Sequence, residues 1–329
     1  MPKVLCTSLN AENGPHLSLL REAGFDVQIV PRDINLYLED NLIPQVRDAV
    51  GVIAGSEPYT RRVLESAPAL RVLSRTGVGF DAIDLAACDE HGIVVATTPG
   101  VNHHSVAEHT IAMLMALARG FPGLDRQVRA GKWKREAFPR VMGRTIGLVG
   151  LGRIGRAVAT RAVGLGMNVV ACEPFPNKEF LEQWRVGIVS LDELLARSDF
   201  VSLHAPMSAG NRHLVNAGTL AKMKRGSILV NTARGALVDE AALYEALKSG
   251  HLGGAGLDVF NVEPLPAHSP LLELENVLFS GHIAGLDQES HFDTFTMAAE
   301  TIVNLLQGQW PSECVQNLRG VTGWCWERT

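Results

Sequence analysis

The sequence predicts an α/β protein with two doubly wound parallel sheets. Apolar runs with the length of β-strands alternate with helical patterns along most of the chain. A glycine motif stands between a strand and a helix near the middle, and 329 residues are enough for two domains. Because alternating strands and helices form parallel sheets covered by helices, we expect this arrangement twice.

The composition is that of an ordinary globular protein, with 46% hydrophobic residues, 20% charged residues and a net charge of −5. Acidic and basic residues are interspersed, which argues against a face that binds nucleic acid or membranes. No apolar run approaches the length of a membrane span and the N-terminus lacks a signal segment, so we expect a cytoplasmic protein. Five cysteines lie scattered without metal-binding spacing, and we expect reduced thiols at Cys6, Cys88, Cys172, Cys314 and Cys325.

The first hundred residues predict one complete α/β unit. Strands are expected at residues 4–7, 27–30, 50–54, 71–74 and 93–97, and helical patterns at residues 15–23 and 60–66 lie between them. This unit is complete before the glycine motif begins, so the motif belongs to a second domain.

The loop after the fourth expected strand is rich in glycine. It reads Ser-Arg-Thr-Gly-Val-Gly-Phe-Asp over residues 74–81. Gly77 and Gly79 at the carboxyl end of a strand free successive amides to point outward, which suits a carboxylate or a phosphate. A tight turn between a strand and a helix explains the same residues equally well.

The segment that follows carries three histidines. Ser105 and Glu108 have the spacing of a capping box that opens a helix, which would run through Ala118 and end before Gly120 and Pro122. Because Glu108 is used in this cap and no cysteine completes a metal site, we expect no metal here. Capping, packing or surface roles are expected for His103, His104 and His109.

The central motif has the order strand, glycine turn, helix, strand, acid. Its parts are residues 146–149, Gly150-Leu-Gly-Arg-Ile-Gly155, residues 153–163, residues 168–172 and Glu173. Gly150 permits the tight turn, Gly152 lets backbone N–H groups approach a pyrophosphate, and Gly155 lets the helix pack against the strand. This is the pattern of a Rossmann dinucleotide site.

The acid that ends this motif also indicates which dinucleotide binds. Glu173 can accept hydrogen bonds from both hydroxyls of a ribose and would repel a 2′-phosphate. Residues 174–177, Pro-Phe-Pro-Asn, offer no arginine for such a phosphate. The sequence therefore predicts NAD rather than NADP as the cofactor.

After Glu173 the alternation of strands and helices resumes. Strands are expected at residues 200–204, 228–231, 254–257 and 276–280, and helix N-caps at Ser190, Asn216 and Asp239. A last long helix, about residues 287–307, is expected to return to the first domain. Several strands deliver a polar residue to the carboxyl edge of the sheet, where ligands of doubly wound sheets bind, namely Arg234, Asp258, Glu263 and His282.

These residue types suit hydride transfer to a 2-keto acid. Arg234 can bind the substrate carboxylate through its guanidinium fork and polarise the carbonyl. His282 titrates in the right range to act as the acid, and a nearby Glu263 would raise the pKa of His282 and fix the orientation of its ring. Backbone amides around Val78 and Gly79 can hold the second carboxylate oxygen.

The sequence resembles the D-isomer-specific 2-hydroxyacid dehydrogenases, and within them the catalytic region of the D-3-phosphoglycerate dehydrogenases. The motifs that carry the resemblance are Gly77-Val-Gly-Phe-Asp81, Gly150-Leu-Gly-Arg-Ile-Gly155, Asn231-Thr-Ala-Arg-Gly-Ala-Leu-Val-Asp239, Leu257-Asp-Val-Phe-Asn-Val-Glu263-Pro264 and His282-Ile-Ala-Gly285. They span nearly the whole chain and keep the order of the family, so the match is highly specific.

The resemblance implies site residues. The catalytic set of the family maps onto Arg234, Glu263 and His282. The implied NAD site is lined by Val78, Gly150, Gly152, Arg153, Ile154, Gly155, Glu173, Ala205, Pro206, Thr232, Ala233, Asp258, Ala284 and Gly285, with Asp258 reading the nicotinamide amide. The implied substrate site comprises Arg75, Gly77, Val78, Gly79, Arg234 and His282.

The resemblance also implies how the chain is divided and assembled. A flavodoxin-like substrate domain of residues 1–101 and 288–329 is expected beside a Rossmann NAD-binding domain of residues 102–287. Homodimers are usual in the family, and the basic patch Gly131-Lys-Trp-Lys-Arg135 falls in a segment that helps the pairing. We expect no nucleic-acid or membrane partner and no regulatory domain.

The sequence departs from the phosphoglycerate dehydrogenases in places. They usually carry an arginine after the third strand that helps hold the substrate phosphate, and the nearest match here is Gly55. Arg75 and Arg135 match other basic positions near that substrate, so 3-phosphoglycerate stays the expected substrate, with hydroxypyruvate or glyoxylate as the alternative. Gly281 replaces the proline that commonly precedes the catalytic histidine, and Leu286 follows Gly285, so the pocket can differ in shape.

Two other functions remain open. Family members that act as NAD(H)-sensing corepressors keep the fold and can retain the catalytic residues, so a binding protein is the alternative of another class. Formate dehydrogenases of the family fit less well, because they carry glutamine where Glu263 stands.

Overall fold

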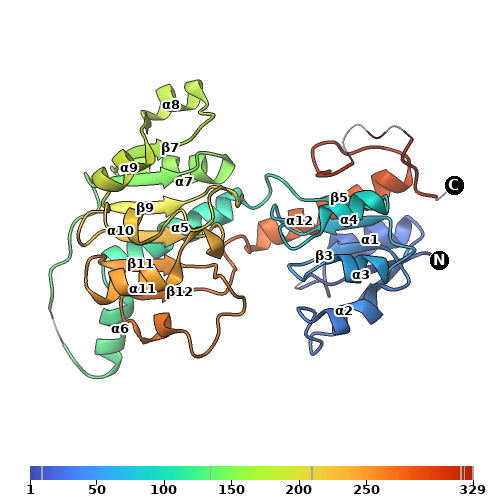
Figure 1. The fold of residues 1–329 in the computed structure, drawn as a ribbon, viewed down its shortest axis with the longest axis horizontal. Coiled ribbons are helices and arrows are strands. Elements are labelled where there is room, and N and C mark those ends of the chain that lie inside the picture. The colour runs from blue at the N-terminus through green and yellow to red at the C-terminus, as the bar shows by residue number, and fades with distance from the viewer. Residues whose placement is uncertain (9, 134, 209, 319–320, 322, 328–329) are drawn as a thin grey trace. The chain divides into compact units, whose positions relative to one another are not determined.

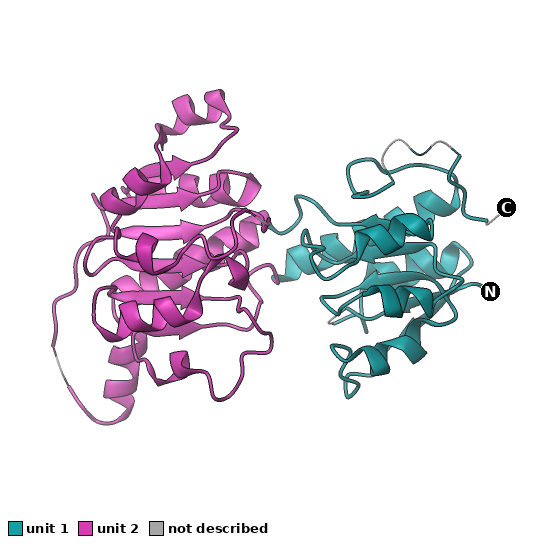
Figure 2. Cartoon of the chain, in the orientation of Figure 1, with its two compact units in different colours: residues 1–102, 287–329 teal, residues 103–286 magenta. Residues whose placement is uncertain are grey.

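The chain forms two compact units (Figure 2). The computed structural model describes residues 1–8, 10–133, 135–208, 210–318, 321 and 323–327. Unit 1 comprises Met1–Asn102 and Asp287–Thr329, and unit 2 comprises His103–Leu286. Both ends of the chain therefore belong to unit 1.

Unit 1 contains a five-stranded parallel sheet with the order β2-β1-β3-β4-β5. Its strands are β1 (Lys3–Cys6), β2 (Asp26–Ile29), β3 (Ala49–Ala54), β4 (Val72–Arg75) and β5 (Val94–Ala96). This is the flavodoxin-like strand order. The chain runs outward from β1 to β2 and then in the other direction from β3 to β5, so the topological switch point lies between β1 and β3.

Helices cover both faces of this sheet (Figure 1). They are α1 (Pro15–Glu22), α2 (Glu39–Val46), α3 (Arg61–Glu65), α4 (Leu85–Glu90) and α12 (Gln288–Leu306). One core joins α1 and α12 to the sheet through residues such as Val4, Phe295 and Ile302. The other core lies under α2, α3 and α4 and includes Leu42 and Tyr59. Helix α12 thus completes a sheet whose strands come from the other end of the chain.

Unit 2 contains a seven-stranded parallel sheet with the order β12-β11-β10-β9-β6-β7-β8. Its strands are β6 (Thr145–Val149), β7 (Asn168–Cys172), β8 (Gly187–Ile188), β9 (Phe200–Leu203), β10 (Ile228–Asn231), β11 (Gly254–Leu257) and β12 (Val277–Phe279). The order reverses between β6 and β9, so this sheet has its switch point at the strand that precedes the glycine motif. The predicted α/β class with two doubly wound parallel sheets is confirmed.

Helices also pack on both faces of the second sheet. The α-helices are α5 (His103–Ala118), α6 (Phe121–Arg129), α7 (Arg153–Gly164), α8 (Lys178–Trp184), α9 (Leu191–Arg197), α10 (Ala217–Leu220) and α11 (Glu240–Lys248), and 3₁₀ helices span Gly235–Leu237 and Pro270–Glu273. Helices α5 and α7 bury Leu114 and Val158 against one face. On the other face α9 and α11 bury Leu194 and Leu243. The side chains of Ser190, Asn216 and Asp239 accept hydrogen bonds from helix amides, which confirms the three predicted N-caps.

The start of α5 differs from the prediction. The helix begins at His103, so Ser105 lies inside it, and the Ser105 hydroxyl donates a hydrogen bond to the carbonyl of Ala284 at 2.8 Å. Glu108 accepts a hydrogen bond from Arg161 at 2.7 Å. The predicted capping box is therefore wrong, because both side chains form hydrogen bonds with residues elsewhere in unit 2 instead of with each other's backbone at the start of α5. After the end of α5, Pro122 lies in the first turn of the next helix, α6.

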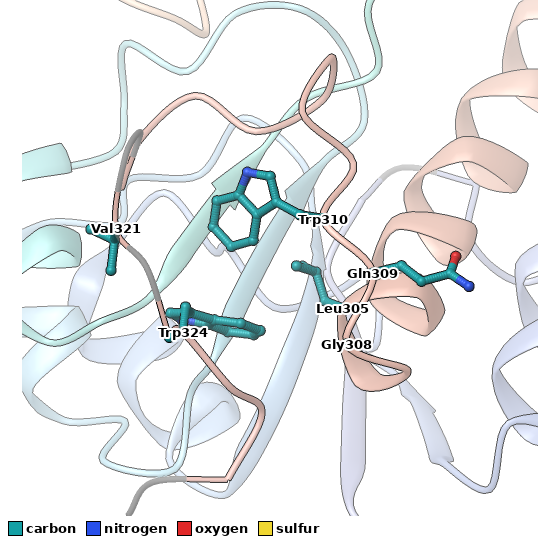
Figure 3. Close-up of a pocket in the computed structure, with 7 residues that line it drawn as sticks. Leu305, Gly308, Gln309, Trp310, Val321 and Trp324 are labelled. Carbon is teal, nitrogen blue, oxygen red and sulfur yellow. The ribbon is translucent and has the colours of Figure 1, made fainter.

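The tail after α12 packs against unit 1 around Arg71. The Arg71 guanidinium donates hydrogen bonds to the carbonyls of Cys325 and Trp326, and it lies 5.1 Å from the ring centroid of Trp324. The indoles of Trp310 and Trp324 face a cavity of about 180 Å³ that Leu305 also lines (Figure 3). Cation–π and hydrogen-bond contacts thus fasten the tail to the sheet.

The five cysteines are free thiols. Burial raises the pKa of Cys6 and of Cys88 to about 12, so neither thiol ionises near neutral pH. None of the helices in the described residues has the length and apolar character needed to cross a membrane.

Candidate active site

Three of the predicted polar residues follow neighbouring strands of unit 2. Arg234 comes after β10, Glu263 after β11 and His282 after β12, and these strands are adjacent in the sheet. Because the strands are parallel, the loops that carry the three side chains leave the same edge.

Glu263 and His282 form a direct contact. The Nδ1 atom of His282 lies 2.7 Å from Oε2 of Glu263, and the other carboxylate oxygen accepts a hydrogen bond from the Phe260 amide at 2.9 Å. Burial raises the pKa of Glu263, but the hydrogen bond and charge of His282 outweigh it, so this pKa lies below its usual value. A carboxylate that accepts the Nδ1 proton orients the ring and leaves Nε2 as the atom that can exchange a proton.

Asp258 organises the loop that carries His282. Its side chain is 1% exposed. The carboxylate accepts hydrogen bonds from the hydroxyl of Ser280 and from the amides of Ile283 and Ala284, both at 2.9 Å. The Asp258 carbonyl accepts a further bond from the His282 amide at 2.7 Å. Sequence reasoning placed Asp258 in the NAD site and missed this supporting role.

His109 supports the same loop from α5. Its Nε2 atom lies 2.9 Å from the Ser280 hydroxyl and 3.8 Å from Oδ1 of Asp258. The sequence assigned His109 only a capping, packing or surface role, and no local pattern links it to a strand far along the chain. His109 thus acts on this loop through the side chains of Ser280 and Asp258, and the Asp258 carboxylate bonds the backbone beside His282.

The backbone at Arg234 is held by the end of its own strand. Asn231 is 1% exposed, and its side chain bonds the Ala233 amide at 3.1 Å and the Arg234 carbonyl at 2.9 Å. The guanidinium of Arg234 donates to the Ala233 carbonyl at 2.6 Å. Thr232 is also held, because its hydroxyl lies 2.9 Å from that of Thr110 in α5.

A glycine brings the loops of Arg234 and Glu263 together. A Cβ atom on Gly235 would lie 2.0 Å from the carbonyl carbon of Phe260 and 2.5 Å from the amide nitrogen of Asn261. The Asn261 side chain also donates to the Val238 carbonyl at 3.2 Å. Only a residue without a side chain permits this backbone contact between the two loops.

The glycine motif forms a tight turn between β6 and α7. Gly150 has a φ of 95°, and a Cβ on Gly155 would lie 2.3 Å from the Gly150 carbonyl oxygen. Gly152 is the N-cap of α7, and a Cβ placed there would meet nothing within 4 Å. The turn therefore packs tightly inward and stays open at the N-terminus of the helix. Arg153 and Ile154 form the first turn of α7.

Glu173 lies beside this turn. One carboxylate oxygen accepts a hydrogen bond from the Leu151 amide at 2.8 Å, and the other accepts one from the Phe175 amide at 3.0 Å. The acid at the end of β7 is thereby tied to the backbone between Gly150 and Gly152. Each oxygen keeps a second lone pair for a ribose hydroxyl.

The other residues implied for the NAD site lie at the same edge of the sheet. Ala205 and Pro206 follow β9, Thr232 and Ala233 follow β10, and Ala284 and Gly285 follow β12. His204 lies under the glycine turn, where the backbone at 204–205 would be 2.8 Å from a Cβ on Gly150. Burial lowers the pKa of His204 to about 3, so this ring is neutral and packs beneath the turn.

The remaining predicted residues belong to unit 1. Arg75 ends β4, and its Nη1 donates to the Thr76 carbonyl at 2.8 Å. The Gly77 amide donates a hydrogen bond to the Thr98 hydroxyl at 2.8 Å, so it does not point outward as expected for an amide that would bind a carboxylate or a phosphate. The amides of Val78 and Gly79 form no hydrogen bond to any residue that the structure describes. Of the amides predicted to point outward, those of Val78 and Gly79 therefore stay available for the predicted anion, and that of Gly77 does not.

Among the described residues, no group of three or more His, Cys, Asp or Glu side chains is arranged to hold a metal ion. The histidines at 103 and 104 instead lie with their ring centroids 4.1 Å apart.

The family model of the NAD-binding domain of D-isomer specific 2-hydroxyacid dehydrogenases matches residues 111–284. The matched segment contains the glycine turn and the loops of Arg234, Glu263 and His282. The chain belongs to this family.

Relatives of this 2-hydroxyacid dehydrogenase have several named activities. It is 42% identical to the glyoxylate reductase of Korarchaeum cryptofilum over 281 residues, which cover 83% of this chain and 85% of the relative. It is 41% identical to the D-3-phosphoglycerate dehydrogenase of Archaeoglobus fulgidus over 295 residues, which cover 89% of this chain and 55% of the relative. The chain thus spans about half the length of the phosphoglycerate dehydrogenases that it matches.

Solved structures of the family share the fold. The D-lactate dehydrogenase from Aquifex aeolicus, complexed with NAD and lactic acid, has a TM-score of 0.85 and 27% identity. The match covers 97% of this chain and 100% of that chain. The predicted family, the Rossmann domain and the NAD cofactor are confirmed, and the protein is an NAD-dependent D-2-hydroxyacid dehydrogenase.

The glycine turn of this dehydrogenase fits NAD. The open N-terminus of α7 at Gly152 can receive a pyrophosphate, because free helix amides and the helix dipole favour an anion there. Glu173, at the end of the next strand, stands where the pattern places the ribose.

Proposed function

We propose that this enzyme interconverts a D-2-hydroxy acid and its 2-keto acid with Arg234, Glu263 and His282 as its catalytic residues. The observation that carries the proposal is the 2.7 Å contact between Glu263 and His282 at the sheet edge that also holds Arg234. A positioned histidine with an ionised carboxylate behind it is suited to acid–base catalysis.

The catalytic residues divide the work of keto-acid reduction. NADH, when bound, supplies the hydride to the carbonyl carbon. Arg234 binds the substrate carboxylate and polarises the carbonyl. His282 donates its Nε2 proton to the carbonyl oxygen, and Glu263 stabilises the imidazolium before this transfer. In the oxidation, His282 takes the proton of the hydroxyl group back.

We also propose roles for the two units. Unit 2 would be the NAD-binding domain and unit 1 the substrate-binding domain, as the family resemblance implies. The amides of Val78 and Gly79 bond no residue that the structure describes, which supports a carboxylate-binding role for their loop. The expected division near residues 101–102 and 287–288 is proposed as the border of these roles. The free thiols support a reducing compartment, so a cytoplasmic location remains our prediction.

A homodimer is proposed through the segment that contains α6. None of the residues of α6 is buried. Phe121 is 63% exposed and Trp133 is 82% exposed. Large exposed aromatic side chains of this kind are typical of subunit interfaces. Lys134 of the neighbouring basic patch lies outside the described residues.

The proposed chemistry is tested by replacing His282 with glutamine. His282→Gln keeps a polar side chain of similar size but cannot act as an acid near neutral pH. We expect kcat for 2-keto acid reduction to fall by about 10²–10⁴, with the binding of NADH little changed. NADH oxidation and NADH fluorescence titration measure the two quantities. Retention of full turnover by the variant would exclude the proposed acid.

A further inference from the structure

The backbone of His282 has a conformation that its residue type disfavours. Its φ is 56°, in the left-handed region, where the Cβ of a residue other than glycine crowds the backbone. The preceding residue, Gly281, is exposed, and glycine restricts its own backbone less than any other residue. The surrounding structure must therefore hold this conformation, which sets the direction in which the imidazole leaves the backbone.

Asp258 supplies the hydrogen bonds that hold it. The Asp258 carbonyl accepts the amide of His282 at 2.7 Å, and the carboxylate accepts the amides of Ile283 and Ala284, both at 2.9 Å. The amides of residues 282–284 thus all bond to one residue. Because two of these bonds end on the carboxylate, the left-handed turn depends on where the Asp258 side chain lies.

The side chains of Ser280 and His109 fix this carboxylate. Oδ1 of Asp258 accepts a hydrogen bond from the Ser280 hydroxyl, and Nε2 of His109 lies 2.9 Å from the same hydroxyl. The hydroxyl has one proton, and an ionised carboxylate can only accept. The Ser280 proton therefore points to Asp258, and His109 supplies an Nε2–H to the hydroxyl oxygen.

Helix α5 carries His109 and contacts the loop at a second point. The hydroxyl of Ser105, one turn before His109, donates to the Ala284 carbonyl at 2.8 Å. The helix thus holds the loop both before and after His282. A long helix that packs on the sheet is a rigid support for such contacts.

We propose that His109 is a positioning residue for the reaction, because it holds the left-handed backbone of His282 through Ser280 and Asp258. The inference rests on the proposed function of His282 as the acid and adds a residue to it. His282 is then oriented from two sides. Glu263 binds its ring directly, and His109 fixes its backbone through two other side chains.

Two substitutions separate the N–H group of His109 from the volume of its ring. His109→Phe fills similar space and donates no hydrogen bond, whereas His109→Gln keeps an N–H group that can reach Ser280. We expect His109→Phe to lower kcat at least about tenfold with little change in KM for the 2-keto acid, because a small displacement of a reacting group is costly. His109→Gln should stay within about threefold of the wild type. NADH oxidation is measured with glyoxylate, hydroxypyruvate and pyruvate, and urea denaturation compares the stabilities.

Ser280→Ala interrupts the same chain of hydrogen bonds at its middle. It should lower kcat at least about tenfold, and it carries the test alone if His109→Phe does not fold. Since both changes break one chain, the double variant should lose no more than about twofold beyond the more impaired single variant.

His104→Phe is the matched control. It removes an imidazole from an exposed site of the same helix and should leave kcat unchanged. The inference is overturned by an unchanged kcat in folded His109→Phe or Ser280→Ala, by equal losses in His109→Phe and His109→Gln, or by multiplied losses in the double variant. Each of these results leaves the proposed function standing. The proposed function itself fails if the wild type reduces none of the 2-keto acids or if His282→Gln keeps full turnover.

Discussion

His282 and Glu263 share one hydrogen bond, and its energy depends on the charge of both partners. The folded pKa of Glu263 lies below its usual value, although burial alone raises it. The carboxylate thus stabilises the fold at any pH above its unfolded pKa, and this contribution is lost as the pH falls through the lower folded value. Asp258 and His109 hold the loop in which the pair forms.

Glu263→Gln should therefore change how stability depends on acid. As the pH falls through and below the usual pKa of a glutamate side chain, the wild-type enzyme loses the contribution of this carboxylate, while the variant has no such contribution to lose. We expect a shallower fall of the unfolding midpoint in the variant, measured by urea denaturation at a series of pH values. Glu65→Gln, on the surface of α3, should follow the wild-type curve. Parallel curves for the wild type and Glu263→Gln would show that the pair does not couple to folding.

At the scale of elements, the active site depends on loops that touch through their backbones. The loop after β10 and the loop after β11 meet at Gly235, where no side chain fits. Their contact sets the positions of Arg234 and Glu263 together, so a change there affects both.

Gly235→Ala should separate these loops. The added methyl group would overlap the backbone at Phe260, and relief of such overpacking typically costs about 1–3 kcal/mol. We expect a lower free energy of unfolding and a fall in kcat/KM. Gly164→Ala is the control, because a Cβ at this position, at the end of α7, would meet nothing within 4 Å. This variant should keep the free energy of unfolding and the kcat/KM of the wild type. A Gly235→Ala enzyme with wild-type stability and activity would show that the loops adapt.

The sequence predicted the elements well wherever the signal is local. Turn glycines, N-caps and apolar runs placed the strands within one or two residues, because neighbouring residues decide these features. The two-residue strand β8 was missed. Ser105 and Glu108 were misread as a cap, since Ala284 and Arg161 bind them from distant parts of the chain.

The candidate site shows the same contrast between local signals, which could be predicted, and long-range contacts, which could not. The resemblance named Arg234, Glu263 and His282, and unit 2 places all three at one sheet edge. The support of the His282 loop by His109 could not be predicted, because it joins α5 to a strand end that only the folded chain brings close to it.

At the scale of the whole molecule, the exposed aromatic residues around α6 bear on assembly. Trp133 is 82% exposed. Trp133→Arg should weaken the proposed dimer at least about 30-fold, since an interface tryptophan commonly contributes 2 kcal/mol or more. Light scattering during size exclusion over a range of concentrations measures this. Leu38→Arg, at a 56% exposed site in unit 1, is the control that should remain dimeric. A monomeric wild type, or an equally tight dimer in Trp133→Arg, would contradict the proposal.

The return of α12 to unit 1 has a consequence for the order in which the protein forms on the ribosome. Ile302 and Phe295 complete the core beneath β1 and β3, and the Ser74 hydroxyl bonds the Ala298 carbonyl at 2.9 Å. These partners emerge only after all of unit 2 has been translated. Unit 2, whose residues are contiguous, can fold as soon as it leaves the exit tunnel. The strands β1 to β5 of unit 1 are synthesised first, but their core is complete only after α12 has been synthesised.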